Sequence, residues 1–176
     1  MKKNITILLG AIAVIAVFYV GQTLSNDRKQ ADVSDIVNEI AMKQFTGQVV
    51  RSFEGEHVLD YSLEIPETAS TSVDMYGALI RITDDSKPLA TMYISYEGAR
   101  GYSPADYINN IVAPHVAVID ITSTSSIGSY EWQEAESAGS EWYIAPVMDG
   151  QWLIVVENKK TAHDSVMNIL NSIMVN

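Results

Sequence analysis

A run near the N-terminus that is uncharged and almost wholly apolar is the feature that most constrains this chain. Residues 5–21 contain no charged side chain, and the run extends to Leu24. About twenty apolar residues suffice to cross roughly 30 Å of hydrocarbon as a helix. Lys2 and Lys3 precede the run, and lysines on a short N-terminal side hold that side in the cytoplasm. We therefore expect one N-terminal transmembrane helix, residues 1–24. It would anchor the chain in the cell membrane, with the C-terminal part outside, periplasmic or extracellular.

Two other interpretations of this N-terminus are less favoured. A cleaved signal peptide has a shorter apolar region and a cleavage site of small residues. Tyr19 puts a bulky ring where such a site needs a small side chain, and residues 23–25 fit the site only weakly. A pilin-type leader would place its charges directly before the glycine, whereas residues 5–9 separate them from Gly10. The chain contains no cysteine, which excludes a lipoprotein anchor.

The composition excludes several classes of function. The formal net charge is −11, and all 22 acidic residues lie at or after Asp27. A surface this acidic repels phosphate backbones, so we expect no nucleic-acid partner. The absence of cysteine also removes disulfides, thiolate metal sites and cysteine nucleophiles. A length of 176 residues allows one domain of ordinary size and an appendage.

A linker and an amphipathic helix are expected in residues 25–46, ahead of a domain in residues 47–176. Residues 25–30 are polar, and Gly47 is placed to end the helix. The helix would dock on the domain or, alternatively, pair with a partner helix. Apolar residues follow at helical spacing and define its buried face: Val33, Ile36, Val37, Ile40, Ala41 and Phe45.

The remainder of the chain predicts strands and two helices. Strand-like runs occupy residues 48–53, 57–65, 75–83, 89–96, 116–121, 130–136, 142–148 and 152–157. Ser103 as N-cap, Pro104 at the first helical position and Asp106 at the third predict a helix that ends near Pro114. Residues 161–164 carry the same capping signal ahead of a closing helix. The apolar stripe of that closing helix consists of Val166, Ile169, Leu170 and Ile173.

Asp149-Gly150 lies between two apolar runs, which is a strong hairpin signal. A two-residue turn there places Val147 opposite Trp152 and Met148 opposite Gln151. Both faces of the two arms carry apolar residues, which is typical of a central hairpin. We expect the hairpin to be covered on one side by helices, and Asp149 to be a turn residue rather than a ligand.

No pattern in the sequence identifies catalytic, cofactor-binding or metal-binding residues. His57, His115 and His163 are scattered and have no acidic neighbour at ligand spacing. A serine paired with a lysine or a histidine remains an open alternative. The glutamates of residues 131–141 suit a solvated strand face, and weak Ca²⁺ binding is the alternative there. These glutamates are Glu131, Glu134, Glu136 and Glu141.

Aromatic residues recur at regular spacing in the last third of the chain. Trp132, Trp142 and Trp152 are ten residues apart, and Tyr130 and Tyr143 lie beside them. Core packing across neighbouring strands is the favoured interpretation. The alternative is an exposed aromatic patch that binds a partner.

Taken together, these elements predict an α+β fold, with a mostly antiparallel sheet flanked by helices. Four features are relevant: residues 61–66 (YSLEIP), the helix from Ser103, residues 141–157, and the helical ending around residues 169–173. Together they resemble the Mog1/PsbP-like α/β/α sandwich. The resemblance spans about residues 48–176. It implies a non-catalytic role in adaptation, assembly or stabilisation of a complex, and it assigns no functional residue.

We therefore expect a membrane-anchored, extracytoplasmic binding or assembly module, with a protein partner in the membrane or envelope and no cofactor. The alternatives are a small membrane-tethered hydrolase that acts on envelope material, and a pilus-like surface component.

Overall fold

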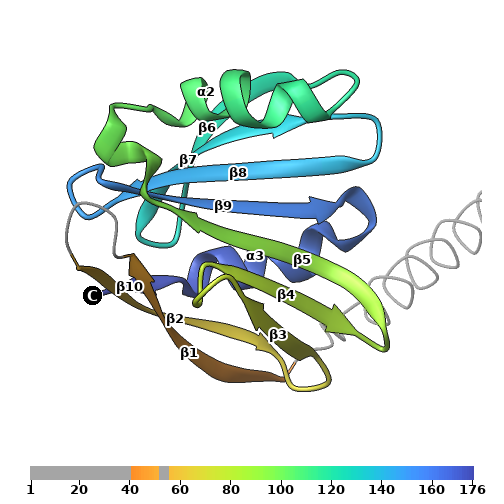
Figure 1. Cartoon of the computed structure of the whole chain (residues 1–176). Helices are drawn as coiled ribbons and strands as arrows, with labels where there is room; N and C mark the ends of the chain where they lie inside the picture. The colour runs from red at the N-terminus through yellow and green to blue at the C-terminus, as the bar shows by residue number, and fades with distance from the viewer. Residues whose placement is uncertain (1–40, 52–55) are drawn as a thin grey trace, which may run out of the picture. The chain divides into compact units, whose positions relative to one another are not determined.

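Two antiparallel β-sheets and several short helices make up the part of the chain that the computed structural model describes, residues 41–51 and 56–176 (Figure 1). The α+β class and the mostly antiparallel pairing are as expected. The predicted transmembrane segment, residues 1–24, lies outside the described residues. Within them, no helix is both long and apolar enough to cross a membrane.

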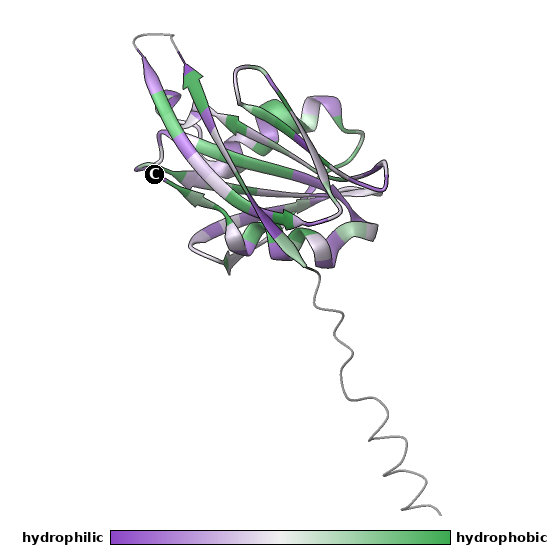
Figure 2. Ribbon diagram, turned by 90° about the horizontal axis from the view of Figure 1, so that it is seen from below, coloured by the Kyte–Doolittle hydropathy of each residue, from purple (hydrophilic) through white to green (hydrophobic). Residues whose placement is uncertain are grey.

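The smaller sheet contains β1 (Met42–Arg51), β2 (His57–Pro66) and β10 (Met174–Val175), in the order β1-β2-β10. β1 and β2 pair along their full length, from Met42 opposite Pro66 to Arg51 opposite His57. β2 alternates as its sequence predicts, with buried Leu59, Tyr61, Leu63 and Ile65. The view from below shows hydrophilic and hydrophobic residues alternating along these strands (Figure 2).

β1 corrects the prediction for the segment before it. Residues 42–45, expected to end an amphipathic helix, are the start of a strand. Gly47 lies inside β1 opposite Tyr61, whose hydroxyl would be 2.2 Å from a Cβ at that position. Pairing with β2 therefore outweighs the helical spacing, and the predicted domain start at residue 47 falls within β1. The rest of the predicted helix, before residue 41, lies outside the described residues.

The larger sheet has seven strands, in the order β3-β4-β5-β9-β8-β7-β6. They are β3 (Ser70–Asp74), β4 (Leu79–Asp84), β5 (Lys87–Ser95), β6 (Asp120–Ile127), β7 (Tyr130–Glu136), β8 (Ser140–Val147) and β9 (Trp152–Lys159).

The last three predicted strands are confirmed as β7, β8 and β9, with ends shifted by at most two residues. The strand predicted at residues 116–121 is wrong over most of its length, because β6 begins at Asp120 and continues to Ile127. β3 is an exposed edge strand without an apolar stripe, so no hydrophobic pattern in the sequence predicts it. The strand predicted at residues 75–83 starts only at Leu79, after a turn.

The mid-chain helix begins as predicted. The Ser103 hydroxyl accepts from the Asp106 N–H, and the Asp106 carboxylate accepts from the Ser103 N–H, which forms a capping box. α2 (Pro104–Tyr107) then continues into the π-helical segment η2 (Ile108–Val112) and the short 3₁₀ helix η3 (Ala113–His115).

The closing helix, α3 (His163–Ser172), follows the 3₁₀ turn η4 (Lys160–Ala162). The predicted cap at residue 161 is wrong, because Thr161 lies in η4 and the N-cap residue Ala162 makes no side-chain hydrogen bond. The predicted apolar face is confirmed, since Val166, Ile169 and Leu170 are buried.

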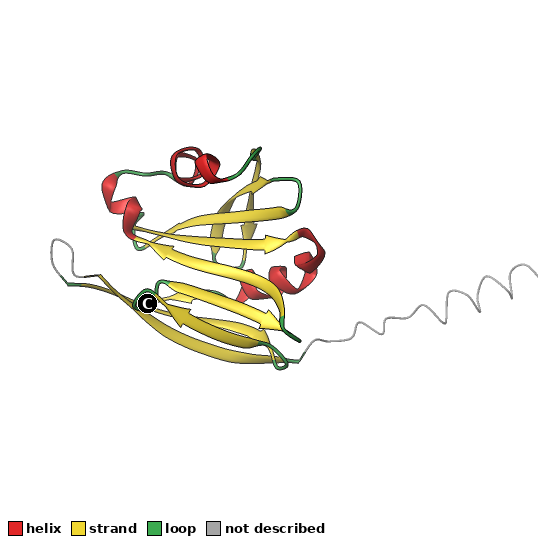
Figure 3. Ribbon diagram, turned by 45° about the vertical axis from the view of Figure 1, so that its right-hand side comes forward, coloured by secondary structure: helices red, strands yellow, loops and turns green. Residues whose placement is uncertain are grey.

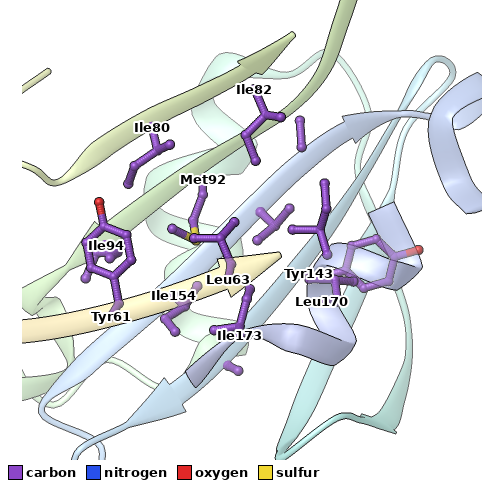
Figure 4. Close-up of a cluster of buried hydrophobic side chains, with 14 of the residues drawn as sticks. Tyr61, Leu63, Ile80, Ile82, Met92, Ile94, Tyr143, Ile154, Leu170 and Ile173 are labelled. Atoms are coloured by element: carbon purple, nitrogen blue, oxygen red, sulfur yellow. The ribbon is translucent and has the colours of Figure 1, made fainter. Parts of the chain in front are cut away.

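The larger sheet is covered on both faces. The smaller sheet and α3 pack against one face, and the α2–η2 segment packs against the other (Figure 3). Residues on β8 and β9 alternate between the two cores: Tyr143 and Ile154 face the first, and Ile144 and Leu153 face the second. Both faces of the hairpin are therefore apolar, but helices lie on both sides rather than on one. Figure 4 shows Tyr61 and Leu63 of β2 beside residues of β4 and β5 in the first core.

The predicted turn between β8 and β9 is confirmed. Val147 pairs with Trp152, and Gln151 N–H donates to the Met148 carbonyl at 3.1 Å. Asp149 and Gly150 have φ of 54° and 79°, the left-handed values that a type I′ turn requires. Met148 also adopts a positive φ, 52°, which the sequence does not predict.

Candidate functional site

The aromatic residues considered as a binding patch are not a surface. Trp132, Trp142, Trp152 and Tyr143 are at most 5% exposed, and only Tyr130 is partly exposed. Trp132 and Trp152 belong to the core beneath the smaller sheet, whereas Trp142 belongs to the core beneath α2. The patch is therefore wrong, and core packing is the correct interpretation. The regular spacing reflects the successive strands β7, β8 and β9.

The three histidines remain apart. His57 stacks on Tyr96 with ring centroids 4.5 Å apart, and His115 lies in η3. His163 begins α3 and binds Glu141 of β8, with 3.0 Å between Nδ1 and Oε2. Within the described ranges there is no group of three or more histidine or acidic side chains placed to hold a metal ion.

Three of the four glutamates of β7 and β8 bind other side chains. Glu134 accepts from the hydroxyls of Ser123 and Ser125, and Glu136 forms an ion pair with Lys160. Glu141 accepts from Asn158 at 3.0 Å and from His163. Glu131 is exposed. The predicted solvated strand face therefore describes Glu131, whereas the other three glutamates bind neighbouring side chains.

The Glu141–His163 pair shifts both titrations. Partial burial raises the pKa of Glu141, but hydrogen bonds from His163, Asn158 and Tyr143 together hold that pKa below its usual value. The hydrogen bond to Glu141 raises the pKa of His163. These contacts join the start of α3 to the beginning of β8, and a structural role explains them adequately.

A serine–lysine contact exists, but its surroundings do not favour catalysis. The Lys159 ammonium donates to the Ser140 hydroxyl at 3.1 Å, where the two residues pair across β8 and β9. Ser140 is buried and Lys159 is exposed. A lysine that acts as a general base needs burial or a neighbouring cation to lower its pKa, and exposure to water works against this.

Exposed apolar residues gather at the β3–β4 turn and the adjoining part of the smaller sheet. Tyr76 is 89% exposed and Met75 is 54% exposed. Val50 and Val58 are direct cross-strand partners on β1 and β2, and both are exposed. The Val50 N–H donates to the Tyr76 carbonyl, which ties the turn to β1. We call these four residues, Val50, Val58, Met75 and Tyr76, the Tyr76 surface.

The turn that carries the Tyr76 surface is held in an unusual conformation. Met75 and Tyr76 have φ of 55° and 57°, and Gly77 follows at 88°. Bulky residues rarely adopt positive φ, and such outliers concentrate at functional sites. A Cβ on Gly77 would lie 1.9 Å from the Gln48 carbonyl oxygen, so only glycine permits the turn to approach β1 this closely. Tyr76 is therefore presented to solvent on a firmly fixed turn.

A cavity of about 150 Å³, which we call the arginine pocket, lies at the Arg51 end of β1. The lining comes from the end of β1, the end of β5 and η1 (Tyr96–Arg100). It consists of Arg51, Tyr93, Ser95, Tyr96, Glu97, Ala99 and Arg100. Arg51 and Arg100 are two of the four arginines in the chain, so the pocket concentrates positive charge on an acidic protein.

The walls of the arginine pocket are braced from several sides. The Arg51 Nη2 donates to the Tyr93 hydroxyl at 3.1 Å, and Arg100 forms an ion pair with Glu97 at 3.1 Å. Tyr96 packs edge-on against buried Trp152 with centroids 4.8 Å apart. The Ala99 N–H donates to the Gln151 carbonyl, which attaches η1 to the β8–β9 turn. The pocket is therefore preformed.

Sequence reasoning missed both features. Arg51 and Tyr93 are 42 residues apart, and no local pattern indicates that their side chains meet. Tyr76 lies within residues 75–83, which the sequence predicts as one strand. Gly77 is the signal in the sequence that indicates the turn. It is the third residue of the predicted strand, and a glycine inside a strand pattern indicates an irregularity in the strand.

Comparisons with known proteins give little guidance. No family model matches the chain, and no curated protein matches it. Among solved structures, it is similar to a crystal structure from Bacteroides thetaiotaomicron VPI-5482, with a TM-score of 0.45 and 11% sequence identity. The match covers 66% of this chain and 45% of that one, so the chain spans less than half of its length. The function of this chain has therefore to be inferred from its own residues.

Proposed function

We propose that the chain is a non-catalytic binding module, anchored in the cell membrane by residues 1–24, whose domain lies outside the cytoplasm and contacts a protein partner in the membrane or envelope. The observation that carries the proposal is Tyr76, almost fully exposed on a turn that is fixed to β1. Tyrosines presented in this way anchor protein interfaces, and clustered exposed apolar residues mark binding surfaces. The apolar run after Lys2 and Lys3 supports the anchor.

The same proposal extends to the fold family. A PsbP-like sandwich behind a transmembrane helix is supported by the order of strands, capped helix, meander and closing helix. An experimental structure of the full chain tests it: a superposition on PsbP-like domains that fails to match strand order would contradict this assignment.

Partner capture from detergent-solubilised membranes, with cross-linking of the full chain, tests the binding role. Asn tolerates positive φ, so Tyr76→Asn removes the ring without straining the turn. Val118→Asn is the matched control, because Val118 is also exposed but lies before β6, outside the Tyr76 surface. We expect Tyr76→Asn to lose the cross-linked partner and Val118→Asn to keep it. Equal capture by both variants would refute the assignment of the surface.

The intact mass of the membrane-extracted chain tests the anchor. We expect residues 1–24 to be retained, because the apolar run is long and residues 23–25 make a poor cleavage site. A mass that lacks about the first 25 residues would show that the segment is a cleaved signal peptide.

A membrane-tethered hydrolase is the second candidate, and the Ser140–Lys159 contact is the observation that favours it. If this pair is catalytic, Ser140→Ala should abolish hydrolysis of envelope material while leaving the fold intact. We expect no such activity in the unaltered chain, because Lys159 is exposed to water rather than enclosed in a site.

A further inference from the structure

Arg51 has no acidic partner in the described residues. The ion pairs formed within residues 41–51 and 56–176 join other side chains: Arg81 with Asp74, Arg100 with Glu97, Lys160 with Glu136, and His163 with Glu141. Arg51 donates from Nη2 to Tyr93, whereas its Nε is buried and meets no acceptor in those ranges. A buried donor without a partner is costly and calls for an explanation, such as an unfilled ligand position.

The charge of the arginine pocket suits a single negative charge. Its lining carries two guanidinium groups and one carboxylate, Glu97, which is paired with Arg100. The described lining residues therefore have a net formal charge of +1. A carboxylate carries one negative charge, whereas a phosphate monoester carries roughly 1.5 to 2 at pH 7. Guanidinium also matches the two oxygens of a carboxylate with a planar fork of donors.

Hydroxyl groups complete the lining. Three of the lining residues, Tyr93, Ser95 and Tyr96, carry a hydroxyl group, and hydroxyls both donate and accept. The described part of the lining contains no histidine, so the group types present there favour binding of an anion over proton transfer.

The size of the cavity excludes a large ligand. Pockets that enclose whole drug-sized molecules measure roughly 300–1,000 Å³, whereas this one measures about 150 Å³. It holds one functional group. The pocket and the Tyr76 surface share one end of β1, because Val50 precedes Arg51 and its N–H donates to the Tyr76 carbonyl. Consecutive side chains of a strand point to opposite faces, so a ligand that reaches both passes around the edge strand β1. A chain with a carboxylate for the pocket and apolar side chains for the surface fits both.

From these observations we infer that the arginine pocket is a carboxylate-binding subsite, in which the Arg51 guanidinium holds a carboxylate of a peptide or protein ligand that also covers the Tyr76 surface. This inference rests on the proposed binding function and specifies the chemistry of its partner. The carboxylate is either a chain terminus or the side chain of an aspartate or glutamate.

Titration of the ¹⁵N-labelled full chain in detergent micelles tests the subsite, with the amides of Glu97, Ala99 and Arg100 as reporters. N-acetylglycine supplies a terminal carboxylate, and N-acetylaspartate amide supplies a side-chain carboxylate. N-acetylglycinamide and N-acetylasparagine amide are their neutral counterparts. Inorganic phosphate is a fifth probe, and sodium chloride keeps the ionic strength constant.

We expect saturable shifts with at least one carboxylate probe, with a dissociation constant on the order of millimolar for so small a ligand. Each neutral counterpart should bind at least about tenfold more weakly. Arg51→Gln should weaken carboxylate binding by at least about tenfold, and Arg51→Lys by less, because lysine keeps the charge but not the fork. Arg81→Gln is the matched control and should bind as the unaltered chain does, since Arg81 pairs with Asp74 outside the pocket.

Several results would overturn the subsite: no saturable shift at residues 97–100, equal binding of a neutral counterpart, unchanged binding by Arg51→Gln, or tighter binding of phosphate than of either carboxylate. If Arg51→Gln does not fold, the comparison of charged and neutral probes on the unaltered chain still decides. If the unaltered chain binds carboxylates but captures no partner, the proposed partner is rejected and the subsite is not. Capture that depends on Tyr76, without carboxylate binding, would reject the subsite alone.

Discussion

At the scale of single residues, two turns adopt the same left-handed backbone conformation at three consecutive positions. Met75, Tyr76 and Gly77 have positive φ, as do Met148, Asp149 and Gly150. In each turn the third residue is glycine, which adopts this conformation without steric cost. Each of the other residues costs free energy, about 1 kcal/mol for a residue with a Cβ. Asp149 is a residue type that tolerates the conformation, whereas Tyr76 is not, which favours a functional reason for the tyrosine.

We predict that Asp149→Ala lowers the free energy of unfolding by about 1 kcal/mol, because alanine tolerates positive φ less well than aspartate. Gly150→Val should lower it further, because a β-branched residue is more strained there. No atom lies within 4 Å of a Cβ built at Gly150, so backbone strain alone should account for the loss. Urea unfolding measures both.

Asp149→Gly is the control for this turn, and it should be at least as stable as the unaltered chain. Partner capture per folded molecule should be unchanged in all three variants. If Asp149→Ala instead abolished capture without altering the unfolding midpoint, the tip of the turn would be part of the binding site.

The Glu141–His163 pair predicts a pH dependence of stability. The pKa of His163 in the folded chain lies above the unfolded value of 6.5. Its contribution to the free energy of unfolding is therefore complete below pH 6.5 and is lost as the pH rises through the folded pKa. The pKa of Glu141 in the folded chain lies below the unfolded value of 4.5. Its contribution to the free energy of unfolding is therefore complete above pH 4.5 and is lost as the pH falls through the folded pKa. The pair should therefore stabilise most between about pH 4.5 and 6.5.

His163→Gln should flatten the fall in stability above pH 6.5, which urea unfolding from pH 5 to 8.5 measures. The effect should stay below about 1 kcal/mol, because the His163 side chain is half exposed and water screens the pair. His115→Gln is the control, because His115 lies in η3 and takes no part in the pair. An unchanged profile in His163→Gln would show that the pair does not influence folding.

At the scale of elements, the two helix starts differ in how they are capped. Ser103 and Asp106 exchange hydrogen bonds at the start of α2, whereas Thr161 makes no cap for α3. α3 relies on its buried face instead, since Val166, Ile169 and Leu170 pack into the core beneath the smaller sheet.

We predict that Ser103→Ala lowers the free energy of unfolding by about 1 kcal/mol, the usual cost of removing an N-cap hydroxyl. Thr161→Ala is the matched control and should change stability by less than about 0.5 kcal/mol. Thermal and urea unfolding of both variants provide the measurement. Equal losses in the two variants would contradict the capping assignment.

At the scale of the whole molecule, β1 decides where the folded unit begins. Its ten residues all pair with β2, and Phe45 lies near Tyr61 with ring centroids 6.3 Å apart. Arg51, at its far end, completes the arginine pocket. The strand therefore contributes both to the core and to the arginine pocket.

We predict that a chain beginning at Ala41 folds, whereas one beginning at Gln48 is destabilised by at least about 2 kcal/mol, because it loses strand pairing and the apolar contact of Phe45. Near-UV circular dichroism and urea unfolding distinguish the two chains. Equal stability of both would mean that the first half of β1 contributes little to the folded unit.

The sequence by itself determined the features that depend on neighbouring residues. The Asp149-Gly150 turn, the Ser103–Asp106 capping box, the strands β7 to β9 and the buried face of α3 follow from turn chemistry and hydrophobic period. These signals act over a few residues, so a local pattern suffices to predict them.

Only the tertiary structure decided features that join distant segments. Residues 42–45 fit a helical period, but pairing with β2 makes them a strand, because its hydrogen bonds and buried Tyr61 come from elsewhere in the chain. The tryptophan spacing was compatible with a surface or a core, and only the covering layers show that it is core. The arginine pocket unites residue 51 with residues 93–100, and the turn that holds Tyr76 is attached to β1. Such contacts depend on how sheets stack and which strands pair, and the local period of a sequence does not encode them.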